Sequence, residues 1–402
     1  MKIAIIGSGI SGLGSVYYLS KDHDIDLYES NSRLGGHTHT HTVTIGDEVA
    51  NVDSGFIVCN NQNYPNILNL FSELDVLLHK ASMSYSFTSE NISWSSNDFD
   101  KIKTFFDPTK LKLLLGIIRF NSLAKKSTKE KITLFEWLNN NNFSNEFIDS
   151  YVLPMAGAIW SSESKNILNF PANTFLRFFN NHGLLKLFNR PTWFSLLNGS
   201  KSYIKKIIDR STINKIYLSA DLKIRREKNI VIIENNAKIK SYDTVIFACH
   251  ANQVKPILID MTKEEKNTLN LFDYNMNRVV LHTDDSLMPE TKNQWSAWNS
   301  YKNDDSDYVT YWMNKLQNLE INKNIFVTLG KFKPLESKFT IKNLSYEHIS
   351  YSFSTLEGQK RIEDIQGLNN TYFVGAHLGY GFHEDGLTSA LRISKMISNE
   401  KF

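Results

Sequence analysis

The order of strand, glycine turn and helix at the start of the chain constrains its fold more than any other feature. Residues 2–6 form an apolar run of strand length, and Gly7, Gly9 and Gly12 follow it at G-x-G-x-x-G spacing. Gly7 permits a tight turn, Gly9 lets the backbone approach a pyrophosphate, and Gly12 lets the helix pack closely on the strand. The pattern therefore predicts a strand that leads into a dinucleotide-binding turn.

The helix after this turn should bind phosphates, because a helix N-terminus carries unpaired N–H donors and the positive end of the helix dipole. Ile10 and Ser11 are the residues expected at that position. A second predicted strand, over residues 26–28, ends in Glu29, about 20 residues beyond the glycines. An acid there accepts hydrogen bonds from ribose hydroxyls and repels a 2′-phosphate, so NADP is disfavoured.

An arginine and a pair of glycines follow the acid at R-x-G-G spacing, as Arg33, Gly35 and Gly36. This tail resembles the FAD-binding signature of the flavin amine-oxidase superfamily, which plain nicotinamide dehydrogenases lack. Paired glycines let a second backbone segment pass against a cofactor without Cβ clashes. The resemblance implies FAD as the cofactor and places His37 beside it. The alternative is a simple Gly-Gly turn next to a surface arginine.

Within that superfamily the chain resembles a bacterial family of predicted NAD/FAD-binding proteins associated with cyclopropane-fatty-acyl synthases. The likeness runs through the segments GGHTHTHTV, VDSGFIV, LPMAGAIW, VTYWMN and GYGFHEDGL. It implies an α/β fold with a Rossmann-like FAD-binding domain of the amine-oxidase type and an interleaved mixed substrate domain. A length of 402 residues also suits two interlocked domains. We expect the FAD-binding domain at 1–61, 205–270 and 350–402, and the substrate domain, with a helical insertion, at 62–204 and 271–349.

The C-terminal region resembles the second FAD motif of the superfamily. Residues 371–374 are a predicted strand that leads to Gly375, and a helix opens near Gly386 and Leu387. The resemblance implies that Gly375, Asp385, Gly386 and Leu387 bind FAD, with the helix N-terminus stabilising negative charge on the reduced flavin.

One departure from the motif is Ala376, which stands where relatives often carry an acid. His377 or Asp385 could replace the missing acid at the ribitol. His383, Glu384 and His377 lie close to the expected position of the flavin ring and are the predicted catalytic residues. Asp385 has an equally good interpretation as a helix cap.

Three histidines alternate with threonines directly after the paired glycines. On an extended strand His37, His39 and His41 share one face. We expect this face to line the cofactor cavity, with a polar sheet face or a metal site as alternatives. No carboxylate nearby in the sequence completes a ligand set, so no metal is predicted. Residues 52–58 form a further predicted strand, whose Asp53 and Gly55 either resemble the segment over the flavin or simply make a bend.

Composition excludes several classes of protein. A net charge of +3 is too small to indicate nucleic-acid binding. The two cysteines, Cys59 and Cys249, have neither zinc-site nor disulfide spacing, which indicates a reducing compartment. The first strand begins at once, without the charged and apolar regions of a signal peptide, and the chain contains no apolar run of membrane-spanning length. We therefore expect a cytoplasmic protein.

A basic amphipathic segment over residues 108–126 bears on membrane contact. It could lie in a membrane interface, which would place the protein at the periphery of the inner membrane, or it could be a core-facing helix with a solvated basic face. The aromatic-rich stretch that includes Phe175, Phe178, Phe179 and Phe188 is similarly either core or a deep apolar substrate pocket.

These features predict an FAD-dependent oxidoreductase that oxidises or desaturates a hydrophobic acyl or isoprenoid chain. The alternatives are a literal amine oxidase, an FAD-dependent isomerase that shifts double bonds without net electron flow, and a non-enzymatic partner of a lipid synthase. No residue stands out as a general base, and the sequence contains no second G-x-G-x-x-G for a separate nicotinamide site.

Overall fold

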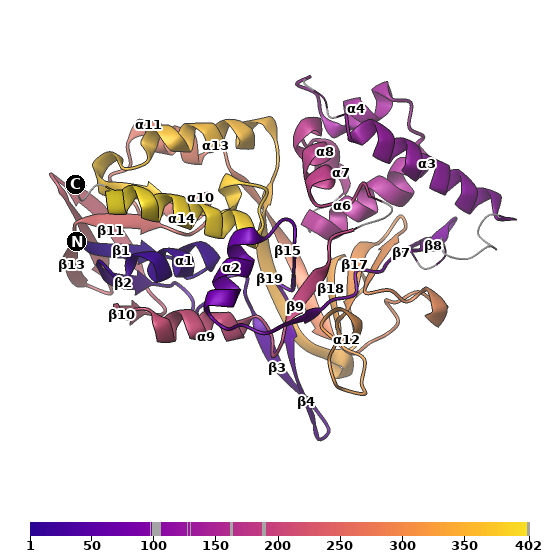
Figure 1. Ribbon diagram of the computed structural model, residues 1–402, viewed down its shortest axis with the longest axis horizontal. Coiled ribbons are helices and arrows are strands. Elements are labelled where there is room, and N and C mark those ends of the chain that lie inside the picture. The colour runs from indigo at the N-terminus through magenta and orange to yellow at the C-terminus, as the bar shows by residue number, and fades with distance from the viewer. Residues whose placement is uncertain are drawn as a thin grey trace.

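The computed structural model describes residues 1–96, 98, 106–126, 128, 130–160, 164–186 and 190–399. This part of the chain forms two halves that lie side by side in Figure 1. One half surrounds a parallel sheet, which includes the N-terminal strand. The other combines a seven-stranded sheet with a group of helices.

The first half is built on a five-stranded sheet in the order β10-β2-β1-β14-β20, with every neighbouring pair parallel. Parallel strands buried on both faces read as nearly continuous apolar runs, as residues 2–6 and 244–247 do. The predicted α/β fold with a Rossmann-like domain is confirmed. The strands are β1 (Lys2–Ile6), β2 (Asp24–Tyr28), β10 (Ile213–Tyr217), β14 (Thr244–Phe247) and β20 (Thr371–Phe373).

Two helices from opposite ends of the chain pack against each other beside this sheet. They are α1 (Ile10–Leu19) and α14 (His383–Asn399), which Figure 1 shows next to one another in indigo and yellow. A Cβ on Gly14 would come within 2.6 Å of Leu387 Cδ1, so the glycine permits the close approach. This packing brings the two predicted FAD motifs into one place.

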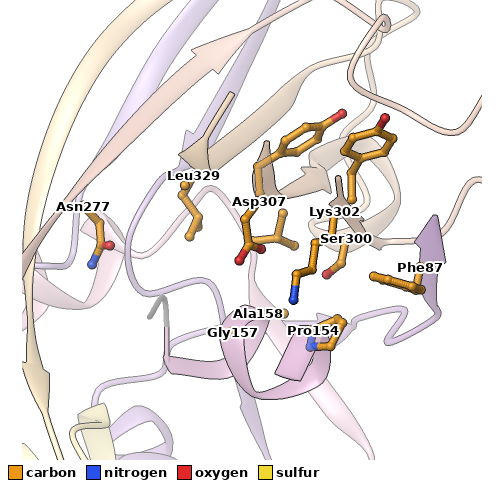
Figure 2. A pocket seen from close by; sticks show the side chains of 13 residues that line it. Phe87, Pro154, Gly157, Ala158, Asn277, Ser300, Lys302, Asp307 and Leu329 are labelled. Atoms are coloured by element: carbon orange, nitrogen blue, oxygen red, sulfur yellow. The ribbon is translucent and has the colours of Figure 1, made fainter. Parts of the chain in front are cut away.

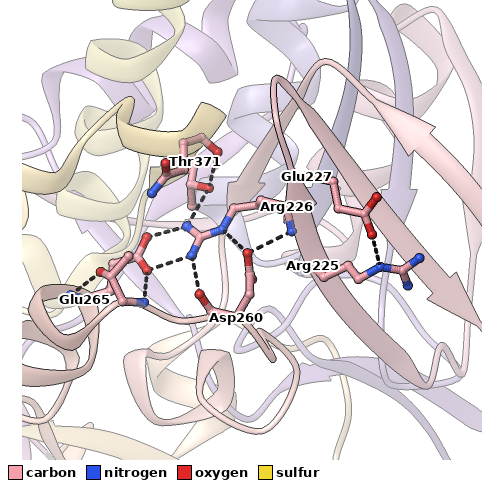
Figure 3. A network of polar contacts seen from close by, with 8 residues as sticks. Arg225, Arg226, Glu227, Asp260, Glu265 and Thr371 are labelled. Carbon is pink, nitrogen blue, oxygen red and sulfur yellow. Dashed lines mark hydrogen bonds and ion pairs between the residues drawn. The ribbon is translucent and has the colours of Figure 1, made fainter.

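An antiparallel meander and three helices complete the first half. Figure 3 shows how Arg226 joins them: its guanidinium is paired with the carboxylates of Glu265 and Asp260 and donates to Thr371 at the start of β20. Arg226 and Glu265 are both buried. The elements are β11 (Leu222–Glu227), β12 (Ile230–Asn235), β13 (Lys238–Tyr242), α10 (Ala251–Val254), α11 (Lys263–Leu269) and α13 (Phe353–Ile365).

The second half contains a seven-stranded sheet in the order β19-β15-β18-β17-β16-β7-β8. Its strands come from two stretches of sequence, one ending at Ser95 and the other beginning at Asp273, and only the β16–β7 pairing is parallel. The strands are β7 (Tyr85–Ser89), β8 (Ser93–Ser95), β15 (Asp273–His282), β16 (Trp298–Lys302), β17 (Asp307–Trp312), β18 (Phe326–Lys331) and β19 (Thr340–Ser350), with α12 (Met313–Leu316) between β17 and β18.

The helical insertion has an aromatic core. Phe175, Phe178 and Phe179 are at most 2% exposed and pack around Trp160, so the structure supports the core interpretation of this stretch. Phe188 lies outside the described residues. The helices are α3 (Pro108–Ala124), α4 (Leu134–Asn140), α5 (Asn145–Phe147), α6 (Leu153–Trp160), α7 (Ser164–Leu168) and α8 (Ala172–Asn181), with one π-helical turn at Ile148–Val152.

Short elements connect the two halves. The strand predicted over 52–58 is interrupted, because the chain bends at Ser54–Gly55 between β4 and β5. A Cβ on Gly55 would lie 2.0 Å from the carbonyl oxygen of His37, so the bend passes directly against that segment. The connecting elements are β3 (Thr40–Ile45), β4 (Glu48–Asp53), β5 (Val58–Asn60), α2 (Pro65–Glu73), β6 (Leu78–Lys80), β9 (Trp193–Leu196) and α9 (Lys201–Arg210).

Candidate functional site

The glycine turn after β1 has the geometry that its sequence predicts. Gly7 has a φ of +104°, which favours glycine, and a Cβ on Gly12 would lie 1.9 Å from the carbonyl oxygen of Gly7. Gly9 differs from both, because a Cβ built there has no described heavy atom within 4 Å. No described side chain caps the helix that follows. The space beside Gly9, at the N-terminus of α1, is therefore open, and an anion could occupy it.

Glu29 lies directly beside this turn. Its buried carboxylate accepts hydrogen bonds from the backbone amide of Ser8 (2.9 Å), the Ser8 hydroxyl (2.5 Å) and the backbone amide of Asn31 (2.8 Å). The acid at the end of β2 is thus oriented by the residue between the first two glycines. This is the placement that ribose recognition in a Rossmann-like domain requires.

The R-x-G-G tail returns to the same turn. A Cβ on Gly36 would lie 3.0 Å from the Cα of Gly9, so the paired glycines let two backbone segments touch. Gly35 donates its amide hydrogen to the carbonyl oxygen of Ser8 (3.0 Å). Arg33 donates to the carbonyl oxygens of Gly36 (2.7 Å) and Thr38, and its partial burial lowers its pKa. The guanidinium therefore fixes this loop.

The second predicted motif also converges on the turn. A Cβ on Gly386 would come within 2.8 Å of both Ile10 and Ser11, and Leu387 is fully buried against α1. The amide of Gly375 donates to the Ser389 hydroxyl (2.9 Å). The N-termini of α1 and α14 therefore lie together, although their sequences are more than 370 residues apart.

Asp385 caps α14. Its carboxylate accepts a hydrogen bond from the backbone amide of Phe382 (2.9 Å), three residues earlier, in the manner of an acid in the first helical turn. Burial raises the pKa of Asp385 to about 6, although these amide bonds oppose the shift. The structure thus supports the cap interpretation, and contact between Asp385 and FAD stays a prediction.

The three predicted catalytic residues lie in different surroundings. His383 stacks on Phe56 (3.7 Å between ring centroids) and pairs through Nε2 with the Thr38 hydroxyl (2.9 Å). Glu384 instead accepts hydrogen bonds from the backbone amides of Asn66 and Ile67, at the start of α2. His377 is buried with its ring against Phe272. Glu384 therefore has a structural partner, whereas His383 adjoins the R-x-G-G loop.

The alternating histidines lie together around Tyr346 of β19. His39 pairs with the Tyr346 hydroxyl (2.9 Å), which also bonds Ser54 (2.7 Å), and Ser54 bonds His41 (2.8 Å). The His37 ring lies 5.3 Å from the Tyr346 ring. Burial lowers the pKa to about 4 in His37 and His41 and to about 3 in His39, so all three are neutral near pH 7.

Two further histidines, which the sequence analysis did not identify, join this group. The rings of His250 and His348 lie 5.7 Å and 5.2 Å from that of His37. His250 contacts the carboxylate of Glu347 (3.2 Å), and His348 pairs with the side chain of Asn277 (2.8 Å). In the part of the chain that the structure describes, no three His, Cys, Asp or Glu side chains are grouped so that they could hold a metal ion.

Asp53 accepts hydrogen bonds from several separate elements. Its fully buried carboxylate accepts hydrogen bonds from Thr40 (2.5 Å), from the hydroxyl of Ser200 (2.7 Å) and from Gln317 (2.7 Å). These partners belong to the β3–β4 hairpin, the start of α9 and the end of α12. Burial raises the pKa of Asp53 to about 6, and the hydrogen bonds from its uncharged partners offset only part of that shift. Asp53 therefore joins the two halves.

A small cavity lies between α6 and the seven-stranded sheet. Figure 2 shows Lys302, Asp307 and Ser300 around it, with Pro154, Gly157 and Ala158 of α6 opposite. Its volume is about 40 Å³, which holds only a few water molecules. Asn277, the partner of His348, also lines this cavity. One residue that lines the cavity therefore contacts the group of histidines.

The helix α3 faces the core. It buries Leu113, Ile117 and Phe120, at the spacing of one helical face, so the core-facing interpretation accounts for that side. Its outer side leaves Leu115 and Ile118 exposed, and both line an open groove beside Arg119. Among the described helices, none is long and apolar enough to cross a bilayer.

Comparisons with known proteins agree with this architecture. A family model of NAD(P)-binding Rossmann-like domains matches residues 5–74. No curated protein sequence matches the chain significantly. A mutant of putrescine oxidase superposes with a TM-score of 0.75 at 13% identity, over 100% of this chain and 99% of that chain. The chain therefore shares the fold of putrescine oxidase along its whole length.

Two other solved structures have the same fold. Cyclohexylamine oxidase from Brevibacterium oxydans IH-35A matches with a TM-score of 0.70 and 12% identity, over 99% of each chain. A CLA-producing fatty acid isomerase from P. acnes matches with a TM-score of 0.68 and 14% identity, over 100% of this chain and 98% of that chain. At these identities the matches establish the fold, and the predicted amine-oxidase type of architecture is confirmed.

Proposed function

We propose that this chain is an FAD-dependent oxidoreductase of the amine-oxidase superfamily that oxidises or desaturates a hydrophobic acyl or isoprenoid chain. The observation that carries the proposal is the meeting of three glycine segments, around Gly9, Gly36 and Gly386, beside the open space at Gly9. Glu29 lies next to this space. The N-termini of α1 and α14 adjoin it, as binding of a dinucleotide requires.

The residues fit FAD on structural grounds. Gly9 leaves room for a pyrophosphate, Glu29 presents an oriented carboxylate for ribose, and the R-x-G-G loop lies against the turn at Gly36. When bound, FAD supplies the acceptor for a hydride taken from a substrate carbon. The chain's own part is to bind and orient the cofactor and to surround the substrate with neutral imidazoles and apolar groups.

Three observations support a hydrophobic substrate. Phe87, Pro154 and Leu329 give the cavity beside α6 an apolar part, although polar residues such as Lys302 and Asp307 also line it. The histidines around Tyr346 carry no charge near pH 7, because burial lowers their pKa values. A fatty acid isomerase is among the proteins with this fold. A cavity of about 40 Å³ must widen before it can admit an acyl chain.

Two other activities have support from the same comparisons. The likeness to a fatty acid isomerase favours a redox-neutral shift of a double bond, in which FAD is needed without net electron flow. The likeness to putrescine oxidase and cyclohexylamine oxidase favours oxidation of an amine. The association with a lipid synthase, as a partner or through the bacterial family, stays a prediction.

The outer side of α3 is the surface that we propose for peripheral membrane contact. Leu115 and Ile118 are 59% and 44% exposed, and the neighbouring Arg119 lies beside the same groove. Apolar burial and attraction to anionic lipids add at such a surface. In a flotation assay at low salt, wild-type protein should rise with anionic liposomes. The Leu115→Asp, Ile118→Asp double variant should stay in the unbound fraction. Equal flotation of the two would exclude this surface.

The cofactor part of the proposal is tested at Gly9. Its backbone has φ −66° and ψ −178°, which any residue can adopt, and its Cβ direction is empty. Gly9→Val should therefore fold like wild type but block the pyrophosphate, so purified variant protein should lack the flavin absorbance of wild type. Gly9→Ser, a smaller change, should retain part of it. Colourless wild-type protein that takes up no added FAD would overturn the proposal.

The substrate is tested by anaerobic reduction of the flavin. A membrane lipid extract should bleach the flavin absorbance if the chain is a lipid oxidoreductase. Unchanged absorbance together with an altered double-bond position in the lipid would support the isomerase. Bleaching and peroxide release with polyamines or aromatic amines, but not with lipid, would support the amine oxidase. A flavoprotein inert to all of these would support the partner role.

A further inference from the structure

We propose that His250, oriented by the carboxylate of Glu347, is the proton acceptor of this site. The inference rests on the proposed function, because it assigns a role in the reaction that FAD would support. It identifies the general base that the sequence alone does not reveal. The two residues are 97 positions apart and come from different halves of the molecule.

The position of His250 follows from the parallel sheet. It comes three residues after β14, at the carboxyl end of that strand, where ligands bind in open α/β sheets. The preceding residues touch the glycine turn: a Cβ on Gly7 would lie 2.8 Å from the carbonyl oxygen of Ala248 and 3.2 Å from the amide nitrogen of Cys249. His250 is therefore held at the same edge of the sheet as the predicted cofactor site.

The orientation of the imidazole follows from its partners. Nδ1 of His250 lies 3.2 Å from Oε2 of Glu347, and a carboxylate oxygen can only accept, so Nδ1 carries the hydrogen. In this tautomer Nε2 carries no hydrogen and has the lone pair that a base requires. Asn252 donates to both oxygens of Glu347 (3.3 and 3.4 Å) and fixes the carboxylate. A base oriented by a hydrogen-bonded acid is a recurrent arrangement in catalysis.

Packing holds the ring in place. His250 stacks on Tyr274 of β15, with 4.5 Å between ring centroids and an angle of 14° between the planes. The Tyr274 hydroxyl accepts a hydrogen bond from the amide of Ala251 (3.0 Å). The side chains of His250 and Glu347 are 27% and 26% exposed, so the pair is partly accessible. A reacting molecule could therefore reach the imidazole.

Burial favours the neutral form of His250, and the titratable groups that face it include Glu347 and three other histidines. Burial lowers the pKa of His250, and the contact with Glu347 opposes that shift. The His37 ring, from the loop before β3, and His348 and His377 lie around it, and burial keeps the pKa of each below its usual range. No proton has to leave His250 before it can accept one at neutral pH.

The proposed step is balanced for a desaturation. Two C–H bonds on neighbouring carbons break and a C=C bond forms. With FAD bound, the cofactor would accept one hydrogen as a hydride, and Nε2 of His250 would accept the other as a proton. The resulting imidazolium is stabilised by the carboxylate of Glu347 and returns the proton to solvent after product release.

The competing explanation is that His250 only begins the short helix α10. Its backbone amide does donate to the side chain of Gln253 (3.2 Å). His250→Asn separates the two roles, because asparagine keeps an N–H donor near the position of Nδ1 but has no base in place of Nε2. Glu347→Gln removes the carboxylate while keeping its shape. Tyr274→Phe, which keeps the stacked ring, is the matched control.

The first experiment measures anaerobic flavin bleaching by a membrane lipid extract between pH 5 and 9. We expect His250→Asn to retain wild-type FAD content and melting temperature but to bleach about 100-fold more slowly or less. Glu347→Gln should slow bleaching about 10-fold and move the acid limb of the pH profile to lower pH. Tyr274→Phe should bleach like wild type. A bleaching rate in His250→Asn equal to that of wild type would overturn the proposal.

The second experiment requires no substrate. Diethyl pyrocarbonate acylates neutral imidazoles, and mass spectrometry gives a rate for each histidine. We expect His250 to be modified faster than His348 and His377, and Glu347→Gln to slow its modification. An unreactive His250, or one whose rate is unchanged in Glu347→Gln, would contradict the proposal. If wild-type protein contains no FAD, the proposed function fails instead, and this rate still tests the orientation of His250 by Glu347.

Discussion

Two buried carboxylates in different regions of the molecule have opposite electrostatic surroundings. Glu265, behind the parallel sheet, is paired with Arg226. Burial alone would raise its pKa, but the hydrogen bonds and ion pair with the guanidinium outweigh that effect and lower it. Asp53, between the two halves, has only uncharged donors around it, and burial raises its pKa to about 6. The pKa of a buried carboxylate is therefore lowered or raised, depending on whether a cation is present.

The difference separates structural support from the proposed active site. The Arg226 network holds the meander and α11 against β20, away from the glycine turn, and an ion pair there does not depend on ligand. The region around Asp53 and the histidines contains a carboxylate with a raised pKa and neutral imidazoles with lowered pKa values, and shifted pKa values of this kind cluster at functional sites. The predictions below test this contrast.

The largest effect is expected from Glu265→Ala. It leaves the buried guanidinium of Arg226 with only Asp260 as a charged partner, which should lower the free energy of unfolding by about 3 to 5 kcal/mol. Urea unfolding measures the loss. The matched control is Glu227→Ala, which breaks the exposed Arg225–Glu227 pair drawn in Figure 3 and should cost less than about 1 kcal/mol. Equal losses would show that burial does not govern these pairs.

The contribution of Asp53 to the stability of the protein should depend on pH. Because its folded-state pKa is raised from 3.8 to about 6, folding binds a proton, and its contribution to stability increases as pH falls through 6. The free energy difference between wild type and Asp53→Asn should therefore be greater at pH 4.5 than at pH 8, by on the order of 2 kcal/mol. Urea unfolding of both proteins at the two pH values measures it. A difference independent of pH would mean that the pKa of Asp53 is the same in the folded and unfolded protein.

His383 tests the effect of burial on a basic side chain. Burial lowers its pKa from 6.5 to about 3, so the unfolded chain binds a proton below pH 6.5 that the folded protein does not. Stability should be lost as pH falls from 6.5 towards 3, by on the order of 2 kcal/mol at pH 5 for this residue. His383→Asn should unfold with a shallower dependence on pH than wild type. An NMR titration that finds a His383 pKa near 6.5 would contradict the prediction.

The sequence alone predicts the parts of the candidate site that depend on local structure. Gly7, Gly9 and Gly12 specify a turn through their own backbone, and Glu29 is placed by a strand of fixed length, so spacing alone locates them. The His250–Glu347 pair depends on the segment after β14 meeting β19 across the two halves, and no periodicity in the sequence indicates such a contact. The role of Asp385 could not be predicted for a different reason. A carboxylate in the first turn of a helix can cap that helix or bind a cofactor, and the sequence is the same in both cases.

Glu384 is intermediate between the two carboxylates and gives the smallest expected effect. Burial raises its pKa, while the backbone amides of Ile67 and Asn66 oppose that shift. Glu384→Gln keeps the shape but removes one acceptor from the start of α2, which should cost about 1 kcal/mol, measured by urea unfolding. The exposed Glu357→Gln is the control. If Glu384 is only a cap, the variant should still bind FAD and bleach with lipid like wild type. Loss of bleaching with unchanged stability and FAD content would instead support the predicted catalytic role, because a cap affects folding and not the reacting atoms.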